Sequence, residues 1–346
     1  MADFGGWLMP IEYPGAGVLA EHAAVRGRVG LFDVSHLGKA SVKGEGALEF
    51  LNSVLTNDLT RVRDMQAQYT MICQEDGGVI DDLIAYRNSP TDIFLIPNAS
   101  NTTDVVATLQ SLAPAGVEVK NLHNEYAVLA LQGPKAVDVL KSLGIEPEMD
   151  YMAFDHVSIG GHQVILCRTG YTGERGYEIV PLWKDASEVW NALVEAMKPF
   201  GGEICGLGAR DTLRTEMGYP LHGHELSLEI TPVQAAAGWS VGWKKEKFRG
   251  DAVIRAEKAD GPSRMLKAIK SNDRGIPRAG MSVLDKAGDV IGIVTSGTFS
   301  PTLKVGIGLA LIKPGIEIGD EVIVDVRGRQ SSATVTTLPF VPSHVR

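Results

Sequence analysis

The chain has 346 residues, a length that favours two or three domains over one compact core. Its composition is ordinary for a globular protein, with 44% apolar and 22% charged residues. The net charge of −9 argues against a nucleic-acid-binding protein, which would carry a basic stripe. No apolar run approaches the roughly 18 residues of a membrane-spanning helix. The first residues lack the basic and apolar regions of a secretory signal, so we expect a cytosolic protein that does not bind a membrane.

The first part of the chain predicts helices followed by a meander of hairpins. Apolar residues recur at helical spacing over 18–26 and 46–55. Extended runs then follow at 69–73, 79–86 and 92–96, and the turn residues Asp76-Gly77-Gly78 separate the first two. Such turn residues between short apolar runs indicate antiparallel pairing.

The middle of the chain alternates helices with strands. The expected helices span 101–113, a segment after Gln132-Gly133-Pro134, a segment from 185, and 209–217, and strands are expected near Val157 and Val164. Helices that pack on mainly antiparallel sheets indicate an α+β fold class.

Beyond about residue 250 the helical patterns fade and short β-runs dominate. Their spacing predicts a small antiparallel barrel or jelly roll. We therefore expect an α+β region over 1–250, with two subdomains of approximately 1–135 and 136–250, and a C-terminal β-barrel domain over 251–346. The boundary should fall between about 245 and 262.

The common nucleotide and metal motifs are missing. The sequence has no GxGxxG after a strand and no GxxxxGK[ST], which excludes the usual dinucleotide and phosphate loops. Three widely separated cysteines form neither a CxxC pattern nor a disulfide framework. His222-Gly-His224 is a weak metal hint on its own, and loop histidines are common, so no metal site is predicted.

The most informative local feature is a pair of aspartates, Asp81 and Asp82, inside an apolar strand. Side chains alternate faces along a strand, so these two carboxylates cannot form one acid/base couple. Asp82 shares a face with Ile84 and Tyr86. A carboxylate near an apolar surface needs a partner or a function. It either caps the Gly-Gly turn or pairs with an Arg, or it faces a ligand with a basic nitrogen.

Two later clusters also carry candidate chemistry. In the segment from Arg168 to Glu178, three glycines allow backbone to approach a ligand closely, although a hairpin turn with a solvated Glu178 explains the pattern equally well. Arg210 falls in the first turn of a predicted helix, where a positive charge opposes the helix dipole. Such an Arg serves a partner or forms a salt bridge to Asp211 or Glu216.

These clusters, in this order, resemble the T-protein family of folate-binding aminomethyltransferases of the glycine cleavage system. The matching segments are Phe4-Gly-Gly-Trp7-x-Met9-Pro10, Leu31 to Gly38, Thr56-Asn-Asp58, Gly77 to Tyr86, Leu131-Gln-Gly-Pro134, Arg168 to Glu178, Gly206 to Asp211 and Thr295 to Thr302. They cover nearly the whole chain.

The resemblance implies a three-domain cloverleaf with a central folate cavity and a C-terminal barrel. It implies transfer of a one-carbon unit from the aminomethyl-lipoyl group of a partner H-protein to the co-substrate tetrahydrofolate, with release of ammonia. The family's catalytic aspartate matches Asp82, beside folate N10. The resemblance assigns the remaining folate-binding positions to Glu178, Arg210, Tyr86, Tyr69, Asn98, Tyr171 and Leu37. Among these, Glu178 would hold the adjacent N–H donors of the pterin, and Tyr86 and Tyr69 would wall the ring system.

Relatives that share the scaffold give the alternatives. Folate-dependent demethylases act on sulfonium or methylamine substrates. Another relative is a non-catalytic folate-binding protein of iron–sulfur maintenance. That last group carries a Lys-Gly-Cys-x-x-Gly-Gln-Glu signature, whereas this chain reads Arg-Thr-Gly-Tyr-Thr-Gly-Glu from Arg168.

Overall fold

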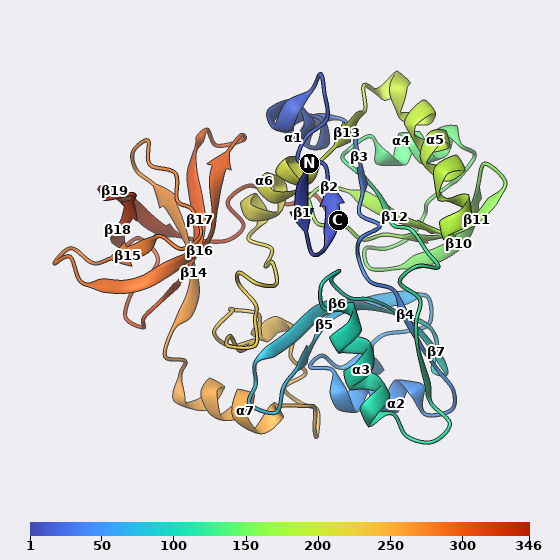
Figure 1. Cartoon of the computed structure of the whole chain (residues 1–346), viewed down its shortest axis with the longest axis horizontal. Coiled ribbons are helices and arrows are strands. Elements are labelled where there is room, and N and C mark those ends of the chain that lie inside the picture. The colour runs from blue at the N-terminus through green and yellow to red at the C-terminus, as the bar shows by residue number, and fades with distance from the viewer. The chain divides into compact units, whose positions relative to one another are not determined.

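The computed structural model describes all 346 residues and groups them into two compact units. The first unit comprises Met1–Thr70, Asp82–Arg210 and Ser343–Arg346, and the second comprises Met71–Asp81 and Asp211–Pro342. Helices combined with mainly antiparallel sheets confirm the α+β class (Figure 1). The domain boundaries given by the sequence pattern stay a prediction.

A six-stranded sheet lies in the first unit, and all its pairs are antiparallel except β3 with β13 at the edge. In spatial order its strands are β10 (Phe154–Ile159), β11 (His162–Cys167), β12 (Gly176–Pro181), β9 (Leu129–Gln132), β3 (Gly30–Asp33) and β13 (Glu203–Cys205). Helices α4 (Ala136–Ser142) and α5 (Ala186–Met197) contribute Leu140 and Leu193 to a buried cluster that also contains Tyr177 and Ile179 of β12. One face of this sheet is therefore a helix-covered core.

The second sheet has five strands and contains the predicted hairpins. Its order is β5 (Gln66–Cys73), β6 (Val79–Ser89), β7 (Asp92–Ile96), β4 (Ala40–Lys43) and β8 (Glu118–Asn121). Helix α2 (Ala47–Val54) packs against β7, and α3 (Thr102–Leu112) packs against β8. The segment Met71–Asp81, which includes the turn between β5 and β6, groups with the second unit.

Shorter elements complete the first unit. They are the N-terminal hairpin of β1 (Ala2–Phe4) and β2 (Trp7–Met9), helix α1 (Gly17–Gly27), and the 3-10 helices η1 (Leu59–Arg61), η2 (Trp183–Asp185) and η3 (Lys198–Phe200). Helix α1 packs against β13 and β3. Helix α6 (Leu207–Met217) begins in the first unit and continues into the second.

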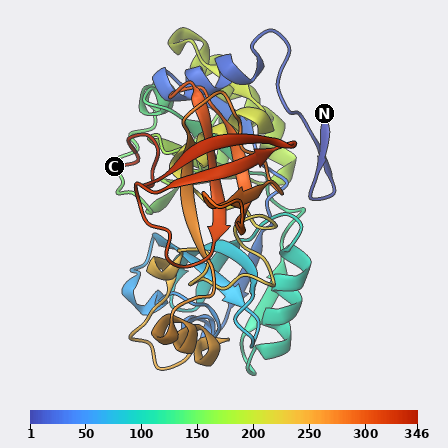
Figure 2. The same cartoon turned by 90° about the vertical axis from the view of Figure 1, so that its left-hand side faces the viewer.

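The second unit contains a closed six-stranded barrel, which confirms the predicted C-terminal barrel (Figure 2, orange to red). Its strands follow the order β14 (Met265–Ser271), β17 (Val305–Ile312), β16 (Val290–Ser300), β15 (Ser282–Leu284), β18 (Glu321–Val326) and β19 (Arg329–Thr336). Alternate apolar residues of these strands, such as Val283, Val322 and Val335, form its buried core.

One helix before the barrel was not predicted. Helix α7 (Asp251–Asp260) follows the 3-10 helix η4 (Gly238–Ser240) and lies within the predicted boundary region, for which no helix was expected. Its single buried residue is Ile254, so the helix contributes little to a core. Gly250 starts it in the left-handed conformation at φ 79°.

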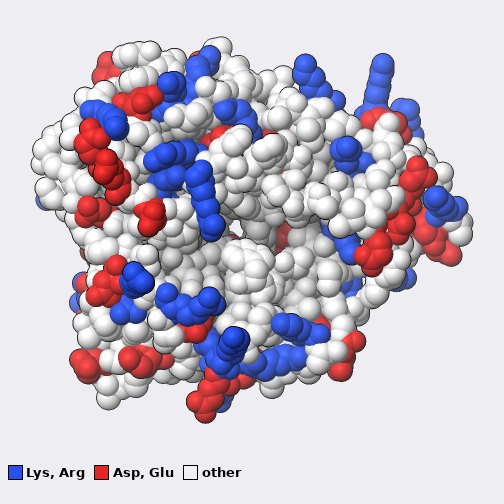
Figure 3. Space-filling view, turned by 180° about the vertical axis from the view of Figure 1, so that it is seen from behind, with Lys and Arg blue, Asp and Glu red and all other residues white.

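The face seen in Figure 3 carries both basic and acidic side chains, and several of the basic ones gather in its lower part. No helix of the structure combines the length and the apolar character needed to span a bilayer.

Candidate active site

Strand β6 places the two neighbouring aspartates in different environments. The Asp81 side chain is fully buried, whereas Asp82 is partly exposed. The alternation along the strand therefore separates the two carboxylates, as the sequence predicts. Asp82 is the one that a ligand can reach.

Two neighbours orient the Asp82 carboxylate. The hydroxyl of Tyr69 donates to Asp82 Oδ2 at 3.0 Å, and Asn98 Nδ2 donates to Oδ1 at 2.9 Å and to the backbone oxygen of Asp82 at 3.0 Å. The pairing of Ile84 with Ile96 and of Tyr86 with Phe94 sets the register that brings Asn98 opposite Asp82. Three of the predicted site residues are thus in direct contact.

The loop that carries Leu37 lies next to Asn98. The Gly38 amide donates to the Pro97 carbonyl at 2.8 Å, which ties this loop to the end of β7. Lys39 Nζ donates to the carbonyl of Leu37 at 2.8 Å and to that of Ser35 at 2.9 Å, and the Lys39 side chain is buried. Leu37 is held in place by contacts of its backbone, and its side chain stays partly exposed.

Glu178 points away from the helix-covered core. Its neighbours Tyr177 and Ile179 belong to the core cluster, so alternation directs Glu178 to the other face of β12. Only 6% of Glu178 is exposed, which excludes the solvated glutamate considered above. Thr169 Oγ1 donates to Glu178 Oε2 at 2.5 Å, and Oε1 receives no hydrogen bond from the protein. Burial raises the pKa of the Glu178 carboxyl, while the Thr169 hydrogen bond and the charge of Arg210 act against that rise.

Tyr86 reaches Glu178 through a hydroxyl relay. Its hydroxyl lies 3.2 Å from Thr169 Oγ1. Because Thr169 gives its only proton to Glu178, Tyr86 is the donor in this pair. The Tyr86 ring is 1% exposed and packs edge-on against Phe154 and tilted against Phe94. The Tyr86 ring is therefore enclosed by protein side chains and does not form the open wall that the resemblance implies.

Arg210 stacks over Tyr171. The guanidinium carbon lies 4.5 Å from the centre of the Tyr171 ring, a cation–π distance. Arg210 is the fourth residue of α6, inside its first turn, as the sequence predicts. Burial, followed by the charges of Arg210 and Lys39, lowers the pKa of His36 to about 3. His36 is therefore a neutral imidazole at pH 7.

The two acidic residues considered as partners of Arg210 are engaged elsewhere. Asp211 Oδ1 accepts from Nε and Nη2 of Arg214, at 2.9 and 2.6 Å. Glu216 accepts from the hydroxyls of Ser300 and Thr302, at 2.5 and 2.9 Å.

Two of the three glycines in the Arg168 to Glu178 segment, Gly170 and Gly176, make room for a protein side chain. A Cβ on Gly170 would lie 2.0 Å from Gln132 Oε1, and one on Gly176 would lie 2.5 Å from Gln132 Nε2. The Gln132 amide donates to the carbonyls of Thr169 and Tyr177 at 3.2 and 3.3 Å. The close approach predicted for a ligand is thus made by Gln132, which braces the loop beneath Glu178.

The histidine pair considered as a metal hint contacts backbone carbonyls. His222 Nε2 lies 3.1 Å from the Val79 oxygen, and His224 Nδ1 lies 2.7 Å from the Thr295 oxygen. The cluster with ligand spacing is instead His162, Asp185 and Glu188. There, one ligand atom of each residue lies within 4.8 Å of the other two, and the ring nitrogens of His162 lie 3.3 and 3.9 Å from carboxylate oxygens of Asp185 and Glu188.

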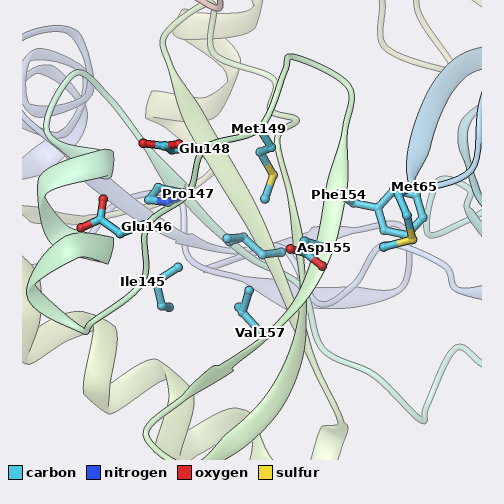
Figure 4. Close-up of a pocket in the computed structure, with 10 residues that line it drawn as sticks. Met65, Ile145, Glu146, Pro147, Glu148, Met149, Phe154, Asp155 and Val157 are labelled. Atoms are coloured by element: carbon cyan, nitrogen blue, oxygen red, sulfur yellow. The ribbon is translucent and has the colours of Figure 1, made fainter.

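A separate cavity of about 250 Å³ lies beside the six-stranded sheet (Figure 4). Its lining residues are Met65, Ile145, Glu146, Pro147, Glu148, Met149, Phe154, Asp155, Val157 and Leu166. None of the eight predicted site residues lines it. All eight lie in the first unit.

Thr169, which donates to Glu178, and Gln132, which braces the same loop, were not predicted, although both lie in segments that match the family. Their roles depend on which strands pair, because β12 lies beside both β9 and β11. Local spacing alone gives no signal for those contacts.

Comparisons with known proteins agree with the segment-by-segment resemblance. The family model for the GCVT N-terminal domain matches residues 1–245, and that for the glycine cleavage T-protein C-terminal barrel domain matches residues 264–342. The chain is 59% identical over 345 residues to an aminomethyltransferase of Parafrankia sp. (strain EAN1pec), covering 100% of this chain and 94% of the relative. It is 58% identical over 348 residues to an aminomethyltransferase of Mycobacterium tuberculosis (strain ATCC 25618 / H37Rv), with the same coverage.

A solved structure of a family member has the same fold as this chain. The aminomethyltransferase T of the glycine cleavage system from Bartonella henselae superposes with a TM-score of 0.92 at 34% identity, covering 99% of this chain and 94% of that one. The chain belongs to the glycine cleavage T-protein family of aminomethyltransferases.

Proposed function

We propose that this enzyme transfers the one-carbon unit from an aminomethyl-lipoyl H-protein to tetrahydrofolate and releases ammonia, with Asp82 as the catalytic residue. The observation that carries the proposal is the Asp82 carboxylate, partly exposed on β6 and oriented by Tyr69 and Asn98. The family of the chain supports the substrate pair.

Asp82 supplies a fixed negative charge where positive charge develops. When a folate nitrogen takes the aminomethyl carbon, the carbon–sulfur bond breaks and the lipoyl sulfur leaves as a thiol. Loss of ammonia from that carbon then gives an electron-poor, iminium-like centre bound to the folate nitrogen. A preorganised carboxylate stabilises such a centre and can accept a hydrogen bond from the attacking amine. Tyr69 and Asn98 hold the two carboxylate oxygens, so little reorganisation is needed during the reaction.

Glu178 fits the recognition of a pterin ring. Tetrahydrofolate supplies the nucleophilic nitrogens and carries the one-carbon unit away. The ring presents neighbouring N–H donors, and a buried carboxylate with an unused oxygen favours such a group over water. Glu178 Oε1 is that oxygen, because Thr169 occupies only Oε2.

Arg210 and Tyr171 provide a flat, charged surface near Glu178. The charge of Arg210 counters the cost of burying the Glu178 carboxylate, since it lowers the pKa that burial raises. Leu37 adds an apolar contact on the side of Asn98. These four side chains are the proposed folate contacts, and Tyr86 supports them through Thr169.

The test is a reconstituted reaction with the full chain. Aminomethyl-loaded lipoyl H-protein and tetrahydrofolate should yield ammonia and 5,10-methylenetetrahydrofolate in equal amounts. Glu178→Gln should weaken tetrahydrofolate binding by about tenfold or more, because a charge-assisted contact is lost. A protein that binds tetrahydrofolate but forms neither product would be a non-catalytic binder, and the proposal would then be wrong.

A further inference from the structure

A second cavity, of about 400 Å³, lies in the first unit outside the proposed folate contacts. Its lining residues are Met149, Asp150, Tyr151, Arg168, Arg175 and Arg346. Three arginines and one aspartate therefore line the same small space. None of the residues assigned to the aminomethyl transfer lines this cavity.

Arg168 is the buried member of the cluster, with 3% of its surface exposed. Its Nη2 donates to the Val345 carbonyl at 2.7 Å and its Nη1 to the Gly176 carbonyl at 3.3 Å. Its Nε is buried and has no partner. The guanidinium carbon also lies 5.3 Å from the centre of the Tyr177 ring, a cation–π contact. No carboxylate lies within ion-pair distance of this guanidinium, so its contacts are with neutral groups and no counter-charge balances it.

Burying the Arg168 guanidinium without an anionic partner costs free energy unless a ligand supplies the missing negative charge. A buried cation without a counter-charge loses its hydration and gains little in return. Burial lowers the pKa of Arg168, and the nearby charge of Arg175 acts in the same direction. The backbone contacts explain how Arg168 holds the 343–346 segment. They do not explain why its Nε is left without a partner, or why Arg175 and Arg346 line the same cavity.

Arg175 and Arg346 complete the positive lining from the exposed side. Both are exposed, and neither forms an ion pair with an acidic side chain. The Arg346 guanidinium lies 5.9 Å from the centre of the Tyr151 ring. Arg346 therefore sits at the aromatic wall of the cavity.

We propose that this cavity binds a small molecule through an oxyanion group, either a phosphate or a carboxylate. Guanidinium groups bind both with paired N–H donors, and a partly buried cluster of them favours a doubly charged group. A volume of about 400 Å³ exceeds the needs of one inorganic ion, so the rest of the ligand packs against Tyr151 and Met149.

Calorimetric titration of the full chain tests the site, with inorganic phosphate and with citrate as probes in chloride buffer of constant ionic strength. The double variant Arg175→Gln, Arg346→Gln removes the two exposed arginines and keeps Arg168. The matched control is Arg61→Gln, Arg63→Gln, which removes two exposed arginines of the same unit outside the cavity.

Wild type and control should bind at least one probe saturably, and the cavity variant should bind it about tenfold more weakly or worse. Tighter phosphate binding identifies a phosphate ligand, and tighter citrate binding a carboxylate ligand. Absence of saturable binding for both probes, or an equal loss of affinity in both double variants, would overturn the proposal. Because neither result depends on turnover, this test is independent of the aminomethyl transfer.

Discussion

Asp82→Asn should separate catalysis from folding and from folate binding. The substitution keeps the shape of the side chain and removes its charge. The new amide oxygen can still accept from Asn98, and the new NH₂ group can donate to the Tyr69 hydroxyl oxygen. The local hydrogen bonds survive with one direction reversed, so the free energy of unfolding should change by less than about 1 kcal/mol.

The expected loss of turnover follows from the charge. A carboxylate about 4 Å from a developing positive charge contributes roughly 4 kcal/mol at an effective dielectric constant of about 20. Asp82 is partly exposed, and water recovers some of that interaction in the variant. We therefore expect a loss of about 3 kcal/mol, which corresponds to roughly a hundredfold lower turnover.

The assay is single-turnover formation of methylenetetrahydrofolate from aminomethyl-loaded H-protein, with the dissociation constant of tetrahydrofolate measured separately. Asp92→Asn is a matched control, because Asp92 lies on the neighbouring strand and pairs with Lys43 at 3.0 Å near the surface. The control should retain wild-type turnover. If Asp82→Asn also turned over at the wild-type rate, the catalytic role of Asp82 would be refuted.

Much of the fold could be predicted because its apolar periods are strong. The segment 92–96 is a strand with the expected bounds, and the region beyond residue 250 contains the predicted barrel. Helix α7 could not be found this way, because it buries one apolar side chain. The parallel pairing of β13 with β3 could not be predicted from local patterns either, since it joins residues about 170 positions apart in the chain.

The site also has features that depend on local sequence, which could be predicted, and features that depend on long-range packing, which could not. Strand alternation was enough to separate Asp81 from Asp82, because it depends on the local backbone alone. The burial of the Tyr86 ring against Phe154 depends on how the two sheets of the first unit meet. The sequence placed Tyr86 on the correct face of β6 and could not show that another sheet covers it.

The remaining predictions concern the supports of the site. Tyr69→Phe removes one of the two donors to Asp82, so turnover should fall by about tenfold while tetrahydrofolate affinity stays unchanged; unaltered turnover would contradict the orienting role. Gly170→Ala drives a Cβ to 2.0 Å from Gln132 and should lower the free energy of unfolding by about 1–3 kcal/mol, measured by urea titration. Lys39→Met tests the buried cation behind Leu37. Burial lowers the pKa of Lys39 from 10.5 to about 8 in the folded protein, so between these values the unfolded chain holds more protons at this residue. Wild-type stability should therefore rise with pH relative to Lys39→Met, by about 2 kcal/mol between about pH 7.5 and 9.5. The difference between the two unfolding curves cancels the other titrating groups, so parallel pH profiles would mean that Lys39 is not held as a destabilised cation.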